Sequence, residues 1–577
     1  EESIQLEPDK REFPEDQDAV KDEWRKYLKY NALVRYHAKL EEQQKKADSD
    51  EDYQPKSEAD LEKEVREEVR SNYDNLFDRL AQMDQEDYTA DYINAILSVY
   101  GPHTEYFPPQ EKENFDISMS GRLEGIGAQL SQVDGDIKVV RIVPGSASWK
   151  QGDLKEEDVV LKVGQAEEEP VSVIGMPLKD AVSMIRGKKD TEVRLTVKKP
   201  DGRIKVIPIV RDVVVLEESY AKSAVIEDKI NNQKIGYIYL PSFYADFSGR
   251  GGRSSADDVR KELEKLKARN VSGVILDLRF NGGGSLQDAV DMSGLFFEKG
   301  PVVQVKGQRG NPVILEDKKN DVVWDGPLSI MINEFSASAS EILAAAMQDY
   351  GRATIIGSRS SFGKGTVQRF VELDYYLPAQ YNAYKPLGSV KLTIQKFYRI
   401  TGKSTQWKGV ESDIVLPDVY SYLDVGEKGL EFALPWDEIT SEPFESWSAD
   451  FNNKQLSVNS MKRIQENEIF QKIEQNAVRM KEQRDKTLQT LNLDSFMAEQ
   501  KQLDEESEKF SDLTKDQDHL VIEPVDKLLP KNRLDSIKVE SLEKWQKELQ
   551  ENVYLGEAMS VMNDLLQQKS VAVTEKK

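Results

Sequence analysis

Three serines stand in a run of small residues that precedes an alanine-rich helix predicted over residues 339–349. The run reads Ser336-Ala337-Ser338-Ala339-Ser340, and Lys364 lies between two glycines further along the chain. A serine hydroxyl becomes a useful nucleophile only when a neighbouring group removes its proton. A lysine can do so when burial in apolar surroundings lowers its pKa and leaves the amine neutral. We therefore predict that Ser338 is a nucleophile and that Lys364 is its general base.

A glycine-rich loop lies upstream of the serines. Residues 274–278 form a short apolar run, which predicts a buried parallel strand, and Asn281-Gly282-Gly283-Gly284 follows it before a predicted helix. This order of strand, glycine loop and helix directs backbone N–H groups toward an anion. The spacing fits neither the GxGxxG loop nor the Walker A loop of nucleotide-binding proteins. In an acyl-transfer site, such N–H groups would stabilise the oxyanion.

Each of these pieces also has a plainer interpretation. The serine run fits a helix cap, and Gly363-Lys364-Gly365 fits a surface turn. The two pieces together, with a glycine loop upstream, favour the catalytic hypothesis. The chain has three histidines, and His103, in a predicted turn, is the weaker alternative base for a Ser-His-Asp arrangement.

The composition excludes several classes of function. The 577 residues suggest about four domains, and their net charge of −25 argues against nucleic acid or an anionic membrane surface as a general partner. The chain has no cysteine, so thiol catalysis, disulfides and thiolate zinc sites are excluded. No apolar run is long enough to predict a transmembrane helix. The sequence begins at Glu1 without a methionine, and we expect that any signal peptide has been removed.

The two ends of the chain are charged and predominantly helical. In residues 1–115, apolar side chains recur at intervals of three and four, which is typical of amphipathic helices. Residues beyond about 420 are again polar, with helices expected over 455–515 and 540–570. We interpret both ends as helical scaffolds that carry no chemistry. Between them, predicted helices alternate with short apolar strands, as in a layered α/β domain.

Residues 119–212 are richer in glycine, valine and isoleucine, and short strands and turns are expected there. This region resembles a PDZ domain through three segments, which are Gly125-Ile126-Gly127, Pro144-Gly145-Ser146-Ala147 and Asp158-Val159-Val160-Leu161. PDZ domains bind the C-terminal carboxylate of a peptide through backbone N–H groups, and the peptide adds as a strand beside a helix. The resemblance implies that Gly125, Ile126 and Gly127 form the carboxylate loop. It also implies a groove lined by Leu178, Val182 and Ile185, although residues on such a helix serve the core equally well.

The whole pattern resembles the carboxy-terminal processing proteases, in particular the tail-specific protease branch. The residues that carry the resemblance lie in four segments, 277–284, 335–342, 346–352 and 362–368. The family comprises Ser/Lys proteases with a PDZ domain inserted ahead of an α/β core related to the crotonase fold.

The resemblance assigns a role to each residue of the site. It implies that Ser338 is the nucleophile, that Lys364 is the base, and that Gln368 helps to hold the lysine in place. It implies that the N–H groups of Ala339, Gly282 and Gly283 form the oxyanion hole. We interpret Asp349, at the end of the alanine-rich helix, as a structural anchor.

The predicted fold class is α+β and multidomain, with a crotonase-like α/β protease core, an inserted PDZ domain, and flanking N- and C-terminal helical domains. The predicted boundaries are 1–118 for the helical N-terminal domain, 119–212 for the PDZ domain, 213–425 for the protease core and 426–577 for the helical C-terminal domain.

The function implied is that of a serine endopeptidase that recognises protein substrates by their apolar C-terminal tails, with no metal, nucleotide or other cofactor. The resemblance further implies a bacterial periplasm or cell envelope as location, a role in processing or degrading envelope proteins, and an adaptor lipoprotein as partner. Two other classes compete with this interpretation. A non-catalytic PDZ scaffold would need neither Ser338 nor Lys364, and a hydrolase of small acyl substrates would not need a PDZ domain.

One segment departs from the family pattern. Residues 357–362 are one residue longer than the pattern, and Arg359 is basic where an acidic residue is usual. The departure leaves the choice of Lys364 intact and leaves open the shape of the loop that leads to it.

Overall fold

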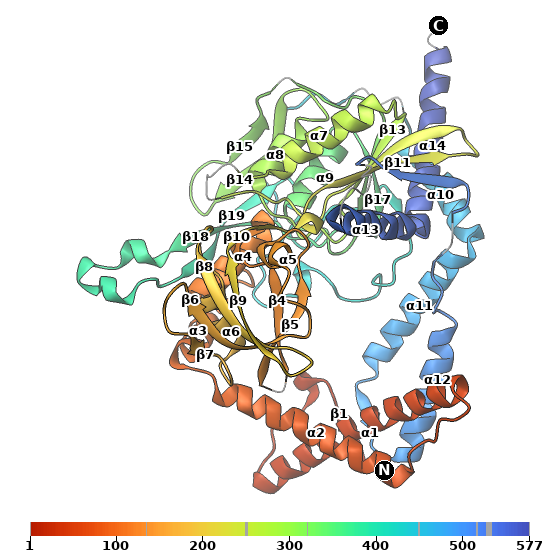
Figure 1. The fold of residues 1–577 in the computed structure, drawn as a ribbon. Helices are drawn as coiled ribbons and strands as arrows, with labels where there is room; N and C mark the ends of the chain where they lie inside the picture. The colour runs from red at the N-terminus through yellow and green to blue at the C-terminus, as the bar shows by residue number, and fades with distance from the viewer. Residues whose placement is uncertain are drawn as a thin grey trace. The chain divides into compact units, whose positions relative to one another are not determined.

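The protein is described by a computed structural model, which covers residues 2–133, 135–247, 252–319, 321–447, 451–514, 517–526 and 533–575. The chain divides into two units (Figure 1). One contains Glu1–Asp87 and Lys472–Leu513, and the other contains Tyr88–Gln471 and Thr514–Lys577. Each unit therefore combines segments from distant parts of the sequence.

The first unit is built mainly from long helices. Its elements are β1 (Ser3–Gln5), α1 (Gln17–Ser49), α2 (Glu58–Ala81), β21 (Leu488–Thr490), α12 (Leu493–Glu508) and most of α11 (Glu468–Asp485). On α2, Leu61, Val65 and Val69 are buried one turn apart, which is the apolar stripe expected from their spacing. Because β1 pairs antiparallel with β21, the N-terminal helices are completed by residues from near the other end of the chain.

The region that resembles a PDZ domain is a small β domain within the second unit. Its sheet has the order β4-β5-β6-β8-β9, with β7 paired to β6. The elements are β4 (Ala128–Val133), β5 (Asp136–Ile142), α5 (Ala147–Gln151), β6 (Val159–Gln165), β7 (Val171–Ser172), α6 (Leu178–Ile185), β8 (Glu192–Lys198) and β9 (Ile204–Val210). Val139, Val163 and Leu195 are fully buried in its core. The chain enters and leaves this domain through an antiparallel pair, β3 (Arg122–Gly125) with β10 (Asp212–Val215).

The centre of the second unit is a seven-stranded sheet in the order β20-β17-β16-β13-β12-β11-β22. Its strands are β11 (Lys222–Asp228), β12 (Gln233–Tyr239), β13 (Gly273–Asp277), β16 (Leu328–Ile332), β17 (Thr354–Gly357), β20 (Ile414–Val415) and β22 (Leu520–Pro524). The strands from β12 to β20 are parallel. Every residue of β13 is buried, which confirms the buried parallel strand predicted at 274–278. The connecting helices are α7 (Ser255–Ala268), α8 (Leu286–Ser293) and α9 (Ala339–Asp349).

A second sheet in this unit carries the lysine loop. It joins β15 (Val313–Asp317), β14 (Gly300–Gly307), β19 (Ser389–Tyr398) and β18 (Thr366–Glu372) in that order, and β2 (Glu105–Phe107) pairs with β19. The connection between β18 and β19 projects away from both sheets (Figure 1, teal). Lys364 lies two residues before β18, so the position of the lysine depends on this sheet.

A buried ion pair joins the second sheet to α9. Arg399, directly after β19, donates from Nε to both carboxylate oxygens of Asp349 at 3.1 and 3.0 Å, and from Nη2 to Gln348 at 2.9 Å. Only 6% of the Asp349 side chain is exposed. The structural role predicted for Asp349 is therefore confirmed, because its carboxylate holds the end of α9 against the β19 segment.

The C-terminal part of the chain contributes to both units. It contains α10 (Asn453–Glu466), α13 (Arg533–Gln550) and α14 (Val553–Glu575) in addition to α11 and α12, so the predicted helices are confirmed. The strand β22 was not foreseen, and it pairs antiparallel with β11 at the edge of the central sheet. A Cβ on Gly273 of β13 would lie 2.5 Å from Met562 Sδ, so α14 packs directly on that sheet. By contacts, Lys472–Leu513 belong to the first unit and the rest of residues 426–577 to the second.

Two further described helices are α3 (Gln85–Leu97) and α4 (Pro109–Ser120). Among the described residues, none of the helices combines the length and the apolar character that crossing a bilayer requires.

The Asp349–Arg399 pair gives a stability prediction. Asp349→Ala leaves a mostly buried guanidinium without its carboxylate, so we expect a loss of about 3 kcal/mol or more in the stability of the second unit. Thermal unfolding followed by circular dichroism measures it. Glu548→Ala, which breaks an exposed pair with Lys544 in the same unit, is the control and should change stability by less than about 0.5 kcal/mol. Equal melting temperatures for the two variants would contradict the anchoring role.

Candidate active site

Three loops meet at one edge of the parallel sheet. β13, β16 and β17 are neighbours, and they are followed by the glycine loop, the serine run and the lysine loop respectively. Parallel strands present their carboxyl ends at the same edge, which is where open α/β sheets place their sites. The topology therefore gathers the three motifs that the sequence singled out.

Backbone hydrogen bonds fix these loops against one another. The Ala337 N–H donates to the Asn281 carbonyl at 3.0 Å, which ties the serine run to the glycine loop. The Phe362 N–H donates to the Ser336 carbonyl, also at 3.0 Å, which ties the lysine loop to the serine run. Ser340 Oγ adds a 2.8 Å bond to the Asn281 carbonyl. The three loops thus form one connected structure.

The strongest link between the nucleophile and base loops is the carboxylate of Glu341. Its Oε2 accepts the N–H of Ser338 at 2.6 Å and the N–H of Lys364 at 3.0 Å. Its Oε1 accepts the N–H of Gly363 at 2.8 Å and the hydroxyl of Ser361 at 2.7 Å. The backbone nitrogens of Ser338 and Lys364 are therefore separated by no more than the sum of two hydrogen-bond lengths.

Burial and hydrogen bonding act on Glu341 in opposite directions. Glu341 is fully buried, and burial raises the pKa of its carboxyl to about 7, although the four donors favour the charged form. A carboxylate that accepts four hydrogen bonds has nearly its full acceptor capacity in use. Glu341 therefore holds the two loops together and has almost no acceptor capacity left for another hydrogen bond.

Ser338 has a strained backbone. Its φ is 58° and its ψ is −110°, although it carries a side chain. A non-glycine residue in such a conformation costs about 1–3 kcal/mol, and strain of this kind concentrates at functional sites. Ser338 is also partly exposed, whereas Ala337 and Ala339 on either side are buried. The turn therefore presents this one hydroxyl-bearing residue toward solvent at the start of α9.

Gly283 lies directly against the nucleophile. Its φ is 102°, and a Cβ at this position would come within 2.8 Å of Ser338 Cβ and 3.1 Å of the Ala339 nitrogen. Glycine is needed here both for the backbone conformation and for the close approach. The glycine loop therefore forms one wall of the space in front of Ser338.

The predicted oxyanion donors have different surroundings. Gly283 directs its N–H to Asn281 Oδ1 at 2.9 Å, so this N–H is engaged within the loop. Gly282 is exposed, and a Cβ there would meet nothing within 4 Å. Ala339 occupies the first position of α9, where backbone N–H groups have no partner within the helix. The geometry thus favours Gly282 and Ala339 over Gly283 as donors to a bound oxyanion.

Burial lowers the pKa of Lys364 to about 8, while the nearby carboxylates of Glu427 and Glu341 act to raise it. Among the described residues, none forms an ion pair with its ammonium group. A lysine with a pKa near 8 has a substantial neutral fraction at slightly alkaline pH, which is what a general base requires.

Gln368 lies four residues beyond Lys364 in β18, next to a break in the strand register. Its Nε2 donates to Thr366 Oγ1 at 2.9 Å and to Thr393 Oγ1 at 3.2 Å. These bonds orient the amide so that Oε1 is left as its remaining hydrogen-bonding atom. The role of Gln368 in holding the lysine stays a prediction.

Side-chain hydrogen bonds hold the segment before Phe362. Ser358 Oγ contacts the carboxylates of Glu334 at 2.6 Å and Asp418 at 3.0 Å. Ser361 Oγ contacts Glu341 and accepts the N–H of Val410 at 2.7 Å. Side-chain hydroxyls thus fix both ends of a loop whose shape the sequence left open.

The predicted peptide site lies in the β domain. Gly127 has a φ of 73°, and a Cβ there would overlap Ser146. The carbonyls of Ile126 and Gly127 accept N–H groups of Ser148 and Val143 within the domain, which holds the loop in shape. Leu178 and Val182 on α6 remain partly exposed.

Ile185 behaves differently from the other two groove residues. It is 4% exposed and belongs to the core of the β domain. Ile185 therefore offers almost no surface to a peptide, and the structure favours the core interpretation for this residue.

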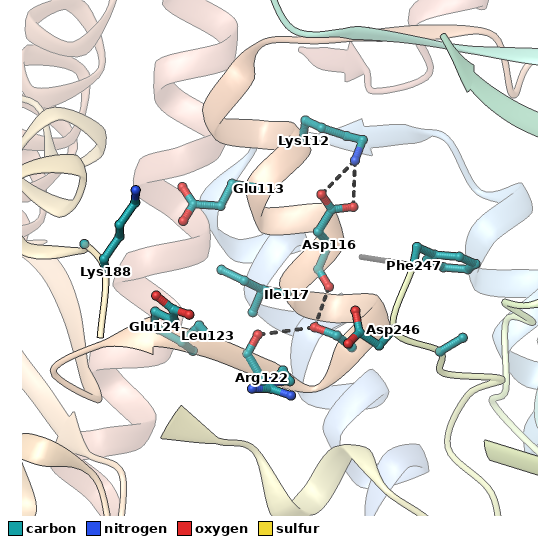
Figure 2. Close-up of a pocket in the computed structure, with 13 residues that line it drawn as sticks. Lys112, Glu113, Asp116, Ile117, Arg122, Leu123, Glu124, Lys188, Asp246 and Phe247 are labelled. Carbon is teal, nitrogen blue, oxygen red and sulfur yellow. Dashed lines mark hydrogen bonds and ion pairs between the residues drawn. The ribbon is translucent and has the colours of Figure 1, made fainter. Parts of the chain in front are cut away.

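A cavity of about 510 Å³ lies beside the segment that leads into the carboxylate loop (Figure 2). Figure 2 shows Lys112 and Asp116 of α4 joined by hydrogen bonds, which measure 2.7 Å to each carboxylate oxygen. Leu123 and Glu124 line the cavity from β3, and Phe247 lines it from the segment after β12. Neither Ser338 nor Lys364 lines it, so this cavity is separate from the three loops.

Sequence reasoning missed two groups of residues in this site. Glu341 follows Ser338 at the third helical position, and this Ser-x-x-Glu spacing is a readable capping-box signal. The second group is Glu427, which the sequence did not single out, together with His103, which the sequence suggested only as an alternative base. The imidazole of His103 contacts Glu427 at 2.8 Å, and no contact with Ser338 is present among the described residues. Because His103 and Glu427 are 324 positions apart in the sequence, no local pattern predicts their contact.

Family profiles cover almost the whole chain. Residues 1–110 match "Tail specific protease N-terminal domain", and 115–198 match "PDZ domain". Residues 234–416 match "Peptidase family S41", and 420–567 match "C-terminal domain of tail specific protease".

Three curated relatives have similar sequences. The tail-specific protease of Haemophilus influenzae is 39% identical over 382 residues, which are 66% of this chain and 53% of the relative. The carboxy-terminal processing protease CtpA of Bacillus subtilis is 33% identical, over 57% of this chain and 64% of the relative. The carboxy-terminal-processing protease of Bartonella bacilliformis is 31% identical, over 58% of this chain and 71% of the relative. The matched region thus spans about half the length of the Haemophilus relative.

The shared carboxylate gives a prediction about activity. Glu341→Gln keeps the size of the side chain but places an NH₂ group against N–H donors, so the two loops must move apart. Displacement of about 1 Å in a catalytic geometry can cost 100-fold, and we expect peptide cleavage, measured as kcat/KM, to fall at least that much. Glu557→Gln, at a buried glutamate paired with Arg463, is the control. A folded Glu341→Gln protein with more than half of the normal kcat/KM would refute the linking role.

Proposed function

Because the chain belongs to the carboxy-terminal processing proteases of peptidase family S41, we propose that it is a serine endopeptidase of the tail-specific type. The nucleophile is Ser338 and the general base is Lys364. The observation that carries the proposal is the Glu341 carboxylate, which binds the backbone N–H groups of both residues.

The chemistry follows from the surroundings of each group. The neutral amine of Lys364 takes the proton of the Ser338 hydroxyl while Oγ attacks the carbonyl carbon of the scissile peptide bond. The N–H groups of Gly282 and Ala339 stabilise the oxyanion of the tetrahedral intermediate. Lys364 then gives its proton to the departing amine, and an acyl-enzyme on Ser338 remains. Water, deprotonated by Lys364, hydrolyses the ester and restores the serine.

The β domain supplies recognition of the substrate. A free C-terminal carboxylate docks on the loop Gly125-Ile126-Gly127, where a backbone turned by glycine can approach an anion closely. The last residues of the substrate add as a strand beside α6, and their apolar side chains contact Leu178 and Val182. Protein substrates with apolar C-terminal tails fit such a groove.

The same family membership supports a cellular setting. We place the protein in the bacterial cell envelope, in the periplasm, where it processes or degrades envelope proteins with the help of an adaptor lipoprotein. The absence of cysteine suits an oxidising compartment. Fractionation of cells that produce the full-length protein tests the location, and recovery in the cytoplasm would refute it.

The proposed dyad predicts the behaviour of three proteins in one assay. Ser338→Ala and Lys364→Ala should each lose cleavage of a model protein with an apolar C-terminal tail by at least about 1,000-fold, with unchanged circular dichroism. Blocking the C-terminal carboxylate of the substrate as an amide should raise KM at least about tenfold for the unaltered enzyme. Full activity in either variant would eliminate the dyad, and an unchanged KM would eliminate carboxylate recognition.

The lowered pKa of Lys364 predicts the pH dependence of cleavage. The base is the neutral amine, so kcat/KM should rise about tenfold per pH unit below the pKa, which is about 8, and level off above it. Initial rates from pH 6 to 10 (roughly the range around that pKa), with stability checked at each pH, give the profile. A plateau already reached near pH 6 would mean that Lys364 is not the base.

A further inference from the structure

A buried glutamate lies directly behind the lysine loop. Glu427, from the short helix η6 (Glu427–Gly429), has only 1% of its side chain exposed. Its backbone N–H donates to the Phe362 carbonyl at 3.0 Å, two residues before Lys364. The segment that carries Glu427 is therefore fastened to the loop that carries the base.

Both carboxylate oxygens of Glu427 have partners. Oε2 lies 2.8 Å from His103 Nε2, and Oε1 accepts Gln406 Nε2 at 3.0 Å. An ionised carboxylate only accepts hydrogen bonds, so a proton on His103 Nε2 would make this contact a hydrogen bond. His103 and Glu427 are 324 residues apart in the sequence, with the PDZ domain and the protease core between them.

Gln406 makes a second connection between Glu427 and the lysine loop. Gln406, which is fully buried, accepts the N–H of Gly365 with Oε1 at 2.7 Å. The same side chain donates to Glu427, so one glutamine joins the carboxylate to the residue after Lys364. Buried polar networks of this kind are rigid when every member is satisfied.

Three charged groups act on the Lys364 amine. Glu427 from η6 and Glu341 from α9 favour its charged form, and Lys391 from β19 opposes it, with Glu427 the larger of the two favourable influences. Glu341 is occupied with four donors, as described above. Glu427 is therefore the carboxylate with the larger influence on a charge that appears on the lysine.

We infer that Glu427, oriented by His103 and Gln406, is a positioning residue that stabilises the ammonium group formed when Lys364 takes the proton of Ser338. The inference rests on the proposed Ser/Lys chemistry and adds a third residue to it. The proton stays on Lys364 until the leaving amine takes it, and Glu427 gains and loses nothing. In this inference Glu427 acts on the reaction only through Lys364.

Two variants should move the pH profile of cleavage to lower pH, by different amounts. Glu427→Gln removes a negative charge near Lys364, so the acid limb of kcat/KM should move at least about half a pH unit lower. The plateau value of kcat should fall about tenfold because the ammonium loses its compensating charge, while KM stays within about twofold. His103→Asn removes the 2.8 Å contact that orients the Glu427 carboxylate, so its acid limb should also move to lower pH, by less than in Glu427→Gln.

The controls separate this inference from the dyad itself. Glu262→Gln removes another buried glutamate, which contacts Ser223 and Lys265, and its profile should match that of the unaltered protein. If Ser338→Ala or Lys364→Ala retains activity, the proposed function fails. If both are inactive while the profiles of Glu427→Gln and His103→Asn match that of Glu262→Gln, only the present inference is overturned. Should Glu427→Gln not fold, an unmoved acid limb in His103→Asn overturns it alone.

Discussion

The arrangement of this protein depends on one carboxylate. Glu341 accepts hydrogen bonds from the backbone of Ser338 and Lys364 with a single oxygen, and it does so from a fully buried position. Burial of a charge is costly unless its hydrogen-bonding capacity is met, and here four donors meet it. The same cost opposes movement of either loop, because a displaced loop would leave a buried carboxylate oxygen without its hydrogen-bond donor.

The sheet and its helices fix the positions of the two loops that Glu341 joins. β13, β16 and β17 are adjacent and parallel, so the loops after them start from fixed points only one strand apart. Arg399 binds Asp349 and thereby fixes the far end of α9, the helix that begins directly after Ser338. The β18–β19 sheet fixes the other side of the lysine loop. A strained serine and a buried lysine can persist because this frame determines their positions.

Much of this was accessible from the sequence, for identifiable reasons. The run at 274–278 predicted a buried parallel strand because both faces of such a strand are apolar, and β13 is buried throughout. The motifs around Ser338 and Lys364 pointed to the family to which the chain belongs. Glu341 could have been found from its spacing to Ser338, since Ser-x-x-Glu is a local pattern.

Other features could not be predicted, because they depend on contacts between distant segments. β22 is short and lies among polar residues, so nothing local shows that it extends the central sheet beside β11. The contact of His103 with Glu427 joins residues that are 324 positions apart in the sequence. The burial of Ile185, as opposed to Val182 on the same helix, depends on how α6 is rotated against its sheet. Periodicity alone leaves that rotation undetermined.

A pair of crystal structures, of the unaltered chain and of Glu341→Gln, both with a peptide boronate on the serine, tests the linking carboxylate most directly. The measurement is the distance between Ser338 Oγ and Lys364 Nζ. It should be about 3 Å in the unaltered protein, within hydrogen-bond reach, and clearly longer when Glu341 is replaced. A short distance in both structures would contradict the claim that Glu341 brings nucleophile and base together, and a long distance in both would contradict the pairing itself.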